Sequence, residues 1–454
     1  MSFRHFAPAE PKRKRAPDVD IFTACREGHI DVVISLLSTE DADVNQANNN
    51  GYTPLFWASG NGHAEIVKLL LAAPGIDVNK ADNDGFTPLY NASWDGHVEV
   101  VKLLLAAPGI DVNQADNNGG YTPLYTASEQ GHVEVVKLLL AAPGIDVNQD
   151  DNDGFTPLYW ASGNGRTEAV KLLLAAGADV NHANNHGWTP LLESCQAGDD
   201  DIIGLLLAAG ADVNKADNDG DTPLWIASSQ GDVEVVKLLL AAPGIDVNLA
   251  NNNGATPLFT ASQEGRAEVV KLLLAAPGID VNQANNDGET PLYATIVEPV
   301  STDIVNMLLA AGADVKKALF LACKSPNLNV DTFRRLLRQP RIDPNARDEL
   351  GRTLLMVAVQ NNKPRLVDIL MADPRVEYEE TITLTASQLA KFMGRHRMSN
   401  RIDTHRRVQQ REANRVFVRR RIDQGDSGKR EAPIHIGHRV GSYFHHDVKT
   451  KLKF

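Results

Sequence analysis

The chain has 454 residues, of which 45 are basic and 58 acidic, for a formal net charge of −13. It holds no apolar run of membrane-spanning length, and its first residues, MSFRHFAPAEPKRKR, lack the apolar core of a secretory signal. These features exclude a membrane-spanning protein, and we expect a soluble intracellular one, cytoplasmic or nuclear.

Charge is distributed unevenly along the chain. Residues 1–17 hold five basic and one acidic residue, and residues 391–454 hold 17 basic and six acidic residues. The 23 basic and 51 acidic residues that remain give residues 18–390 a net charge of −28. An acidic surface favours basic partners and argues against binding to nucleic acid or an anionic membrane, although solubility alone also accounts for it.

The N-terminal 17 residues are predicted to be disordered and contain a dense basic cluster of the kind that nuclear import receptors recognise. The cluster consists of Lys12, Arg13, Lys14 and Arg15. An ordinary charged tail has the same composition, so both interpretations stay open.

An internal repeat organises most of the chain. The tripeptide Thr-Pro-Leu recurs with spacings of 34, 35, 34, 33, 33, 34 and 34 residues, starting at Thr53, Thr87, Thr122, Thr156, Thr189, Thr222, Thr256 and Thr290. This period indicates a stacked solenoid, in which each unit packs only against its neighbours. Additional length therefore adds surface rather than separate cores.

Each unit predicts two helices and an extended turn. In the unit that begins at Gly51, Thr53 can cap the first helix through its hydroxyl, and Pro54 fits the first helical position. Gly62 suits the left-handed residue that follows this helix. The second helix, AEIVKLLLAA, is apolar around most of its circumference, and the next residues, IDVNKADNDG, predict an extended segment with a tight turn, called the finger below.

These motifs resemble the ankyrin repeat family, whose 33-residue unit combines a β-turn with two helices and carries the motif T-P-L-H-x-A. The resemblance implies an all-α repeat solenoid of helix-turn-helix units with short β-hairpin fingers, about twelve units with the caps included. The family histidine is replaced in every unit, by Phe56, Tyr90, Tyr125, Tyr159, Leu192, Trp225, Phe259 and Tyr293. Its packing role can survive, but its imidazole hydrogen bonds cannot.

We expect one solenoid between two basic segments. Residues before the first Thr-Pro-Leu keep Gly28 and a second helix, which is typical of an N-terminal cap, and Thr385 with Gln388 fits a capping box in a C-terminal cap. The predicted segments are a disordered N-terminus (1–17), the N-cap (18–50), regular units (51–287), irregular units (288–380), the C-cap (381–402) and an Arg-rich, largely disordered tail (403–454).

The ninth unit is interrupted. Val315 lies four residues before Leu319, whereas Val44 lies eleven residues before Leu55, so seven finger residues are missing. The gap can create a bend or a partner pocket, or it can be a tolerated decay of the repeat.

Aromatic residues precede Thr-Pro-Leu in the first five such units only. In the family this position projects from the finger onto the concave face, so stacking would align one row of Tyr52, Phe86, Tyr121, Phe155 and Trp188. Trp57, Trp94 and Trp160 on first helices can join the row. Large rings are typical interface anchors, which favours partner binding, and packing between neighbouring fingers is the alternative. The later units have Asp221, Ala255 and Glu289 at this position, although the scaffold continues.

Catalysis is not predicted. The sequence has no phosphate loop, no metalloprotease helix motif and no nucleophile with a base outside the repeat pattern, so we expect no catalytic residue, cofactor or metal. The histidines near the C-terminus lack a cysteine partner and are not assigned a metal: His435, His438, His445 and His446. Three cysteines lie too many units apart for disulfides and are predicted to be buried: Cys25, Cys195 and Cys323.

Two functions remain. The first is a monomeric, non-enzymatic scaffold or adaptor that binds a partner protein, of basic character, through its concave face of fingers and first helices. The second is a nucleic-acid-linked adaptor whose tail contacts phosphates through Arg406, Arg407, Arg411, Arg415, Arg419, Arg420 and Arg421. A solvated basic tail accounts equally for this arginine cluster, and the resemblance implies protein binding without a particular pathway.

Overall fold

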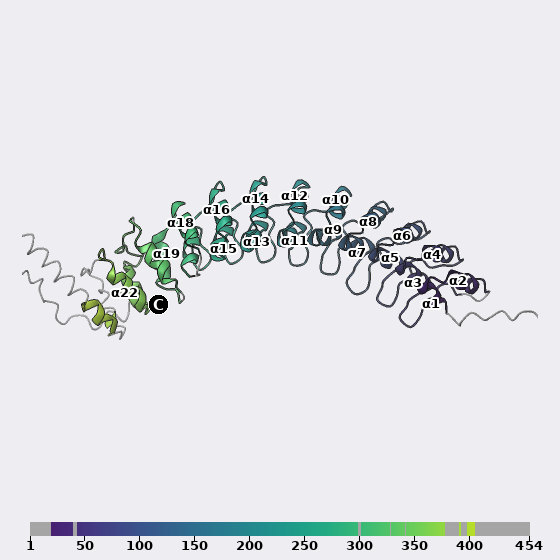
Figure 1. The fold of residues 1–454 in the computed structure, drawn as a ribbon, viewed down its shortest axis with the longest axis horizontal. Coiled ribbons are helices and arrows are strands. Elements are labelled where there is room, and N and C mark those ends of the chain that lie inside the picture. Colours follow the sequence, from purple (N-terminus) through teal and green to yellow (C-terminus); the bar gives the residue numbers. More distant parts are fainter. Residues whose placement is uncertain are drawn as a thin grey trace, which may run out of the picture. The chain divides into compact units, whose positions relative to one another are not determined.

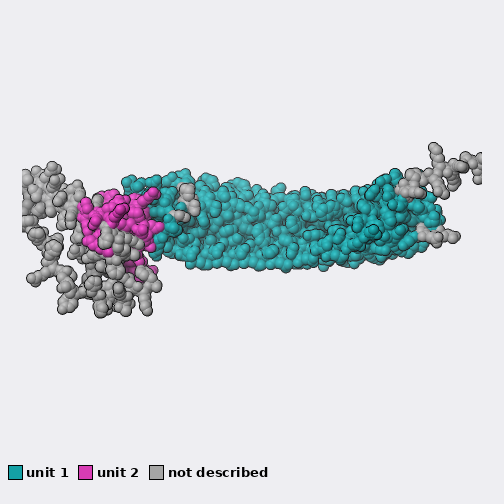
Figure 2. All heavy atoms as spheres, turned by 90° about the horizontal axis from the view of Figure 1, so that it is seen from below, with its two compact units in different colours: residues 1–346 teal, residues 347–454 magenta. Residues whose placement is uncertain are grey.

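The computed structural model describes residues 20–39, 43–297, 301–326, 328–340, 342–376, 390–391 and 397–404. The chain divides into two compact units, residues 1–346 and residues 347–454, which Figure 2 distinguishes by colour.

The first compact unit consists of repeated pairs of short helices, and from α1 to α16 Figure 1 shows the two helices of each pair in separate rows. The first helices are α1 (Ile21–Glu27), α3 (Pro54–Gly60), α5 (Pro88–Trp94), α7 (Pro123–Gln130), α9 (Pro157–Gly163), α11 (Pro190–Ala197), α13 (Pro223–Gln230), α15 (Pro257–Gln263), α17 (Pro291–Val297) and α19 (Val315–Ala322). The second helices are α2 (Ile30–Leu37), α4 (Ala64–Leu71), α6 (Val98–Leu105), α8 (Val133–Leu140), α10 (Thr167–Ala175), α12 (Asp200–Ala208), α14 (Val233–Ala241), α16 (Ala267–Ala275), α18 (Thr302–Ala310) and α20 (Val330–Leu337). Neighbouring first helices pack together from α1 to α19, and neighbouring second helices do so from α2 to α18, as expected of a solenoid.

The second compact unit contains the packed pair α21 (Leu354–Gln360) and α22 (Pro364–Ala372), together with helical residues 390–391 and 397–404. Arg401 forms an ion pair with Asp368 of α22, and Ile402 is buried. The predicted C-terminal cap lies partly outside the described residues, and its boundaries, like those of the other predicted segments, stay predictions.

Local chemistry explains where each first helix begins. The Thr53 hydroxyl accepts a hydrogen bond from the backbone N–H of Phe56 (3.0 Å), and Pro54 occupies the first turn. The same threonine cap recurs at the start of every Thr-Pro-Leu helix from α3 to α15. Leu55 and Leu70, one from each helix of the pair, are fully buried and belong to the core. The predicted helix starts are therefore confirmed.

Gly62 shows why the turn between the helices needs glycine. Its φ of 74° is left-handed, and a Cβ there would lie 2.7 Å from Nδ1 of His97 in the next unit. His97 in turn places Nε2 3.0 Å from the carbonyl oxygen of Gly60, and because a carbonyl only accepts, this nitrogen carries the proton. The turn thus provides both a reversal of the chain and a hydrogen bond between units.

The fingers contain tight turns. In the finger before α5, the N–H of Asp82 donates to the carbonyl of Phe86, and the N–H of Gly85 donates to the carbonyl of Asp82, both at 3.1 Å. Across the described residues the structure has no strand, and its one isolated bridge joins Arg347 and Thr353. The all-α repeat solenoid is confirmed, whereas the short β-hairpins are not confirmed as strands.

Asparagines at one register of the fingers connect successive units. The side-chain amide of Asn79 donates to the carbonyl of Gly109 (2.7 Å), and its oxygen accepts from the N–H of Asp111 (2.8 Å). This ladder reaches the interrupted ninth unit, where Asn282 accepts from the N–H of Asp314 (2.7 Å). The missing finger residues therefore leave the ladder bond to the start of α19 intact.

Candidate functional site

The aromatic residue of each finger has a fixed backbone. The N–H of Phe86 donates to the carboxylate of Asp82 four residues earlier (2.9 Å), and the N–H of Asp84 donates to the same oxygen (3.0 Å). Burial raises the pKa of Asp82, although the hydrogen bonds from finger N–H groups lower it. Equivalent bonds hold the backbone N–H groups of Tyr52, Tyr121, Phe155 and Trp188. The finger therefore presents each ring from a rigid turn.

Four of the five predicted finger rings are half-buried against a second ring of their own unit. The second ring lies four residues later, on the first helix, where the family has histidine. The pairs are Tyr52–Phe56, Phe86–Tyr90, Tyr121–Tyr125 and Phe155–Tyr159, with centroid distances of 4.7, 4.7, 4.8 and 4.7 Å. Trp188 is half-buried too, but the residue four positions later is Leu192. Among the described residues the ring contacts lie within units, so the rings form separate pairs on successive units.

The three predicted tryptophans extend these pairs. Trp57 lies 5.1 Å from the Tyr52 ring, edge to face, and Trp160 lies 5.3 Å from the Phe155 ring. Trp94 comes from a later position of its helix and stacks on Tyr90 at 6.3 Å, with 43% of its surface exposed. We call the surface formed by these tryptophans and the five finger rings the aromatic face.

Tyrosines at the family-histidine position link neighbouring units. The Tyr125 hydroxyl donates to a carboxylate oxygen of Asp151 (3.1 Å), and the Tyr159 hydroxyl donates to Glu193 (2.6 Å). Burial is the main cause that raises the pKa of both phenols, and the adjacent carboxylates add to it. The imidazole hydrogen bonds that the sequence lacks are therefore replaced, in these two units, by phenol hydrogen bonds to the next unit.

Charged residues beside the rings were missed by the sequence analysis. The guanidinium carbon of Arg26 lies 5.7 Å from the centroid of the Trp57 ring. Glu129 adds to the raised pKa of Tyr121 and Tyr125 as a smaller cause than burial. Aligning the repeat units position by position would have placed both charges next to the aromatic face.

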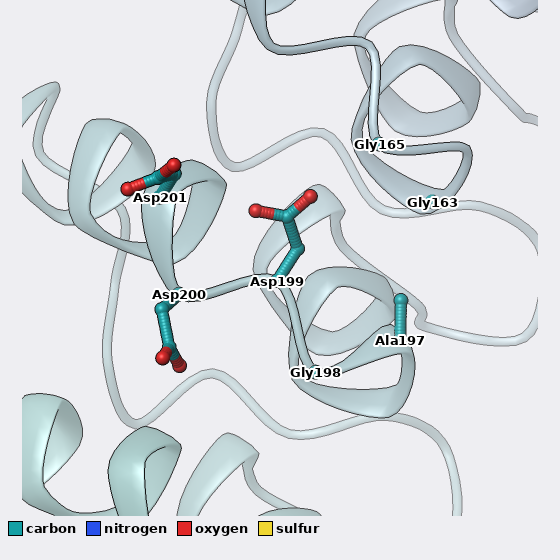
Figure 3. A pocket seen from close by; sticks show the side chains of 7 residues that line it. All are labelled: Gly163, Gly165, Ala197, Gly198, Asp199, Asp200 and Asp201. Carbon is teal, nitrogen blue, oxygen red and sulfur yellow. The ribbon is translucent and has the colours of Figure 1, made fainter.

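A pocket of about 450 Å³ lies between the turn after α9 and the turn after α11 (Figure 3), lined by Gly163, Gly165, Ala197, Gly198, Asp199, Asp200 and Asp201. In the preceding unit, Arg166 donates through Nε to the carbonyl of Glu129 (3.1 Å). Asp199, at the same repeat position, is too short to do so and accepts from the N–H of Ile202 (3.1 Å) instead. The pKa of Asp200 is raised, mainly by desolvation and further by neighbouring carboxylates. The pocket thus marks a concentration of negative charge.

The remaining predicted sites lie outside the described residues. They are the N-terminal basic cluster (Lys12, Arg13, Lys14 and Arg15) and the tail arginines (Arg406, Arg407, Arg411, Arg415, Arg419, Arg420 and Arg421). Cys25, Cys195 and Cys323 are buried, as predicted. Of the helices in the described ranges, none has the length and apolarity needed to cross a membrane.

Comparison with protein families gives a match over most of the chain. The family model described as ankyrin repeats (3 copies) matches five overlapping segments, residues 21–116, 114–184, 177–251, 243–318 and 301–382. The chain therefore belongs to the ankyrin repeat family, whose members generally mediate protein–protein interaction and are typically non-enzymatic. No curated protein was found to match the chain.

Proposed function

We propose that this protein is a scaffold or adaptor that binds a basic segment of a partner protein on its aromatic face. The observation that carries the proposal is the set of half-buried rings that rigid fingers present on successive units. Such rings bury a large area on binding and lose little conformational entropy, because their rotamers are already fixed by the ring partner. The excess of carboxylates in the solenoid supports a basic partner.

The test compares partners captured from a cell lysate. The bait proteins are the wild type and a variant with alanine at the finger positions Tyr52, Phe86, Tyr121, Phe155 and Trp188, after circular dichroism and thermal unfolding confirm that both fold. A control with Asp221→Ala and Glu289→Ala changes the same finger position in the half without rings. Partners lost only from the five-alanine variant support the proposal, and equal capture by all three proteins contradicts it.

A second variant removes a ring with little effect on the fold. Because 43% of Trp94 is exposed, Trp94→Ala removes contact area from the aromatic face and leaves the finger pair of Phe86 and Tyr90 in place. We expect this variant to capture less of the same partners at unchanged thermal stability.

A further inference from the structure

Two units carry a tryptophan directly after the paired helix ring, and the distances between their rings are similar. The distance from the finger ring to the tryptophan is 5.1 Å in the first Thr-Pro-Leu repeat and 5.3 Å in the fourth. The distance from the helix ring to the tryptophan is 6.0 Å in the first repeat and 5.5 Å in the fourth. The two clusters are Tyr52, Phe56 and Trp57, and Phe155, Tyr159 and Trp160. Differences in the charged residues around them can therefore be compared position by position.

The residue contributed by the preceding unit differs in charge. Arg26 places its guanidinium carbon 5.7 Å from the Trp57 centroid, within the range of a cation–π interaction. Glu129 holds the same repeat position before Trp160. The carbonyl of Arg26 lies 3.0 Å from Nε2 of His63, and the carbonyl of Glu129 accepts from Nε of Arg166 at 3.1 Å. Trp57 thus has a cation supplied by its own chain, whereas the equivalent residue before Trp160 is a carboxylate.

The following unit adds a carboxylate beside Tyr159, whose ring contacts Trp160. Glu193 accepts a hydrogen bond from the Tyr159 hydroxyl (2.6 Å), and its Cγ lies 2.7 Å from where a Cβ on Gly163 would be. The corresponding residue after Trp57 is the neutral Asn91. Glu129 and Glu193 are half-buried, and neither forms an ion pair with the part of the chain that the structure describes.

We propose that Trp160, Glu129 and Glu193 form a subsite for one arginine side chain of the partner. The guanidinium lies over the Trp160 ring, as that of Arg26 lies over Trp57, and donates hydrogen bonds to the carboxylates. Arginine fits better than lysine because its planar group can stack on a ring and still donate within its plane. This subsite deepens the proposed function and rests on it, since it requires a partner segment on the aromatic face.

The test uses the peptide acetyl-Gly-Gly-Arg-Gly-Gly-amide as the probe and the full chain as the receptor. The readout is the NMR signal of the Trp160 indole N–H, assigned through Trp160→Phe. We expect a saturable shift with the arginine peptide, and we expect Glu129→Gln to weaken binding about tenfold. The same peptide with citrulline, which keeps the shape and lacks the charge, is expected to give no shift. Glu134→Gln is the matched control, because it removes a carboxylate from the second helix α8 and should leave binding unchanged.

A reciprocal pair of variants tests the comparison between the two clusters. Glu129→Arg is expected to place a guanidinium over Trp160 and to abolish peptide binding. Arg26→Glu is expected to create a second site, seen as a new saturable shift of the Trp57 indole signal. Binding of the citrulline peptide as tight as that of the arginine peptide, or wild-type affinity in Glu129→Gln, would overturn the subsite.

The two proposals fail in different experiments. If the five-alanine variant loses its partners while Glu129→Gln binds the arginine peptide as the wild type does, only the subsite is wrong. If the five-alanine variant captures the same partners as the wild type, the proposed function is wrong, whatever the peptide does.

Discussion

Replacing a ladder asparagine should lower stability in proportion to the hydrogen bonds it makes. Asn79 makes two bonds to the next finger, one to the carbonyl of Gly109 (2.7 Å) and one from the N–H of Asp111 (2.8 Å). A protein hydrogen bond contributes about 0.5–1.5 kcal/mol net, so Asn79→Ala should lower the free energy of unfolding by about 1–3 kcal/mol.

The chain supplies its own control for this prediction. Asn148 holds the same register and is half-buried like Asn79, but within the described residues its side chain makes one such bond, accepting from the N–H of Asp179 (2.8 Å). Asn148→Ala should therefore cost about half as much, about 0.5–1.5 kcal/mol. Asn79→Asp keeps the acceptor for Asp111 and loses the donor to Gly109, so it separates the two bonds.

Amide hydrogen exchange followed by NMR is the direct assay, because repeat proteins open locally and a single unfolding midpoint averages over units. Asn79→Ala should speed exchange at the Asp111 amide, and Asn79→Asp should leave that amide protected. Urea unfolding of each variant gives the total loss. Equal losses for Asn79→Ala and Asn148→Ala would refute the reasoning, because the second hydrogen bond would then contribute nothing.

Three further predictions follow from single contacts. Gly75 has a φ of 77° and open space where a Cβ would be, whereas a Cβ on Gly62 would lie 2.7 Å from His97. Gly75→Ala should therefore lower the free energy of unfolding by about 1–2 kcal/mol, and Gly62→Ala should lower it clearly more, as measured by thermal unfolding. Equal losses would contradict the role of the contact with His97. Burial raises the folded-state pKa of Tyr90, Tyr125 and Tyr159 above the ordinary 10.0, so the stability they contribute is fully present below about pH 10 and is lost as the pH rises above it. Phenolate absorbance should show that these groups ionise only on alkaline unfolding. Replacing them with phenylalanine should remove part of the pH dependence of stability. Burial raises the pKa of the Cys25 thiol to about 12. A thiol reagent at about pH 8 should therefore react with Cys25 in guanidinium chloride and not in the native protein. A fast reaction in the native protein would contradict the burial of Cys25.

Most of the fold could be predicted because its determinants act over a few residues. Thr53 reaches an N–H three residues away, Pro54 fixes its own φ, and Gly62 adopts a left-handed conformation within one turn. Each rule needs only the local sequence, and the period of the repeat then specifies stacking. The β-hairpin fingers were the less accurate part, since the Asp82 carboxylate closes the finger before α5 by accepting backbone N–H groups, without a strand pair.

The candidate site could be predicted only in part. The positions of the finger rings follow from the repeat register, but their partners depend on packing: four of the five rings pair within their own unit, and Tyr159 reaches Glu193 in the next one. The same limit applies to the acidic pocket, where Asp199 does not repeat the bond that Arg166 makes in the preceding unit. The bonds from Tyr159 to Glu193 and from Arg166 to Glu129 join residues about one repeat apart, so the units must be aligned before these neighbours are known.

The variation among units is consistent with the proposed binding surface. Leucine recurs at the buried position of α3, α5 and α7, because any change there alters the packing between units. The position of Arg26 is occupied in the next four units by Gly60, Trp94, Glu129 and Gly163. The carbonyl at this position nevertheless pairs with a His or Arg side chain of the next unit at Arg26, Gly60, Trp94 and Glu129. Since caps, ladder and buried leucines hold the backbone without these side chains, the proposed function predicts that their charge and size depend on what contacts the aromatic face. Under the proposed subsite, Arg26 and Glu129 have different consequences at one repeat position: a cation of the chain lies over the Trp57 ring, whereas the Trp160 ring accepts a cation of the partner.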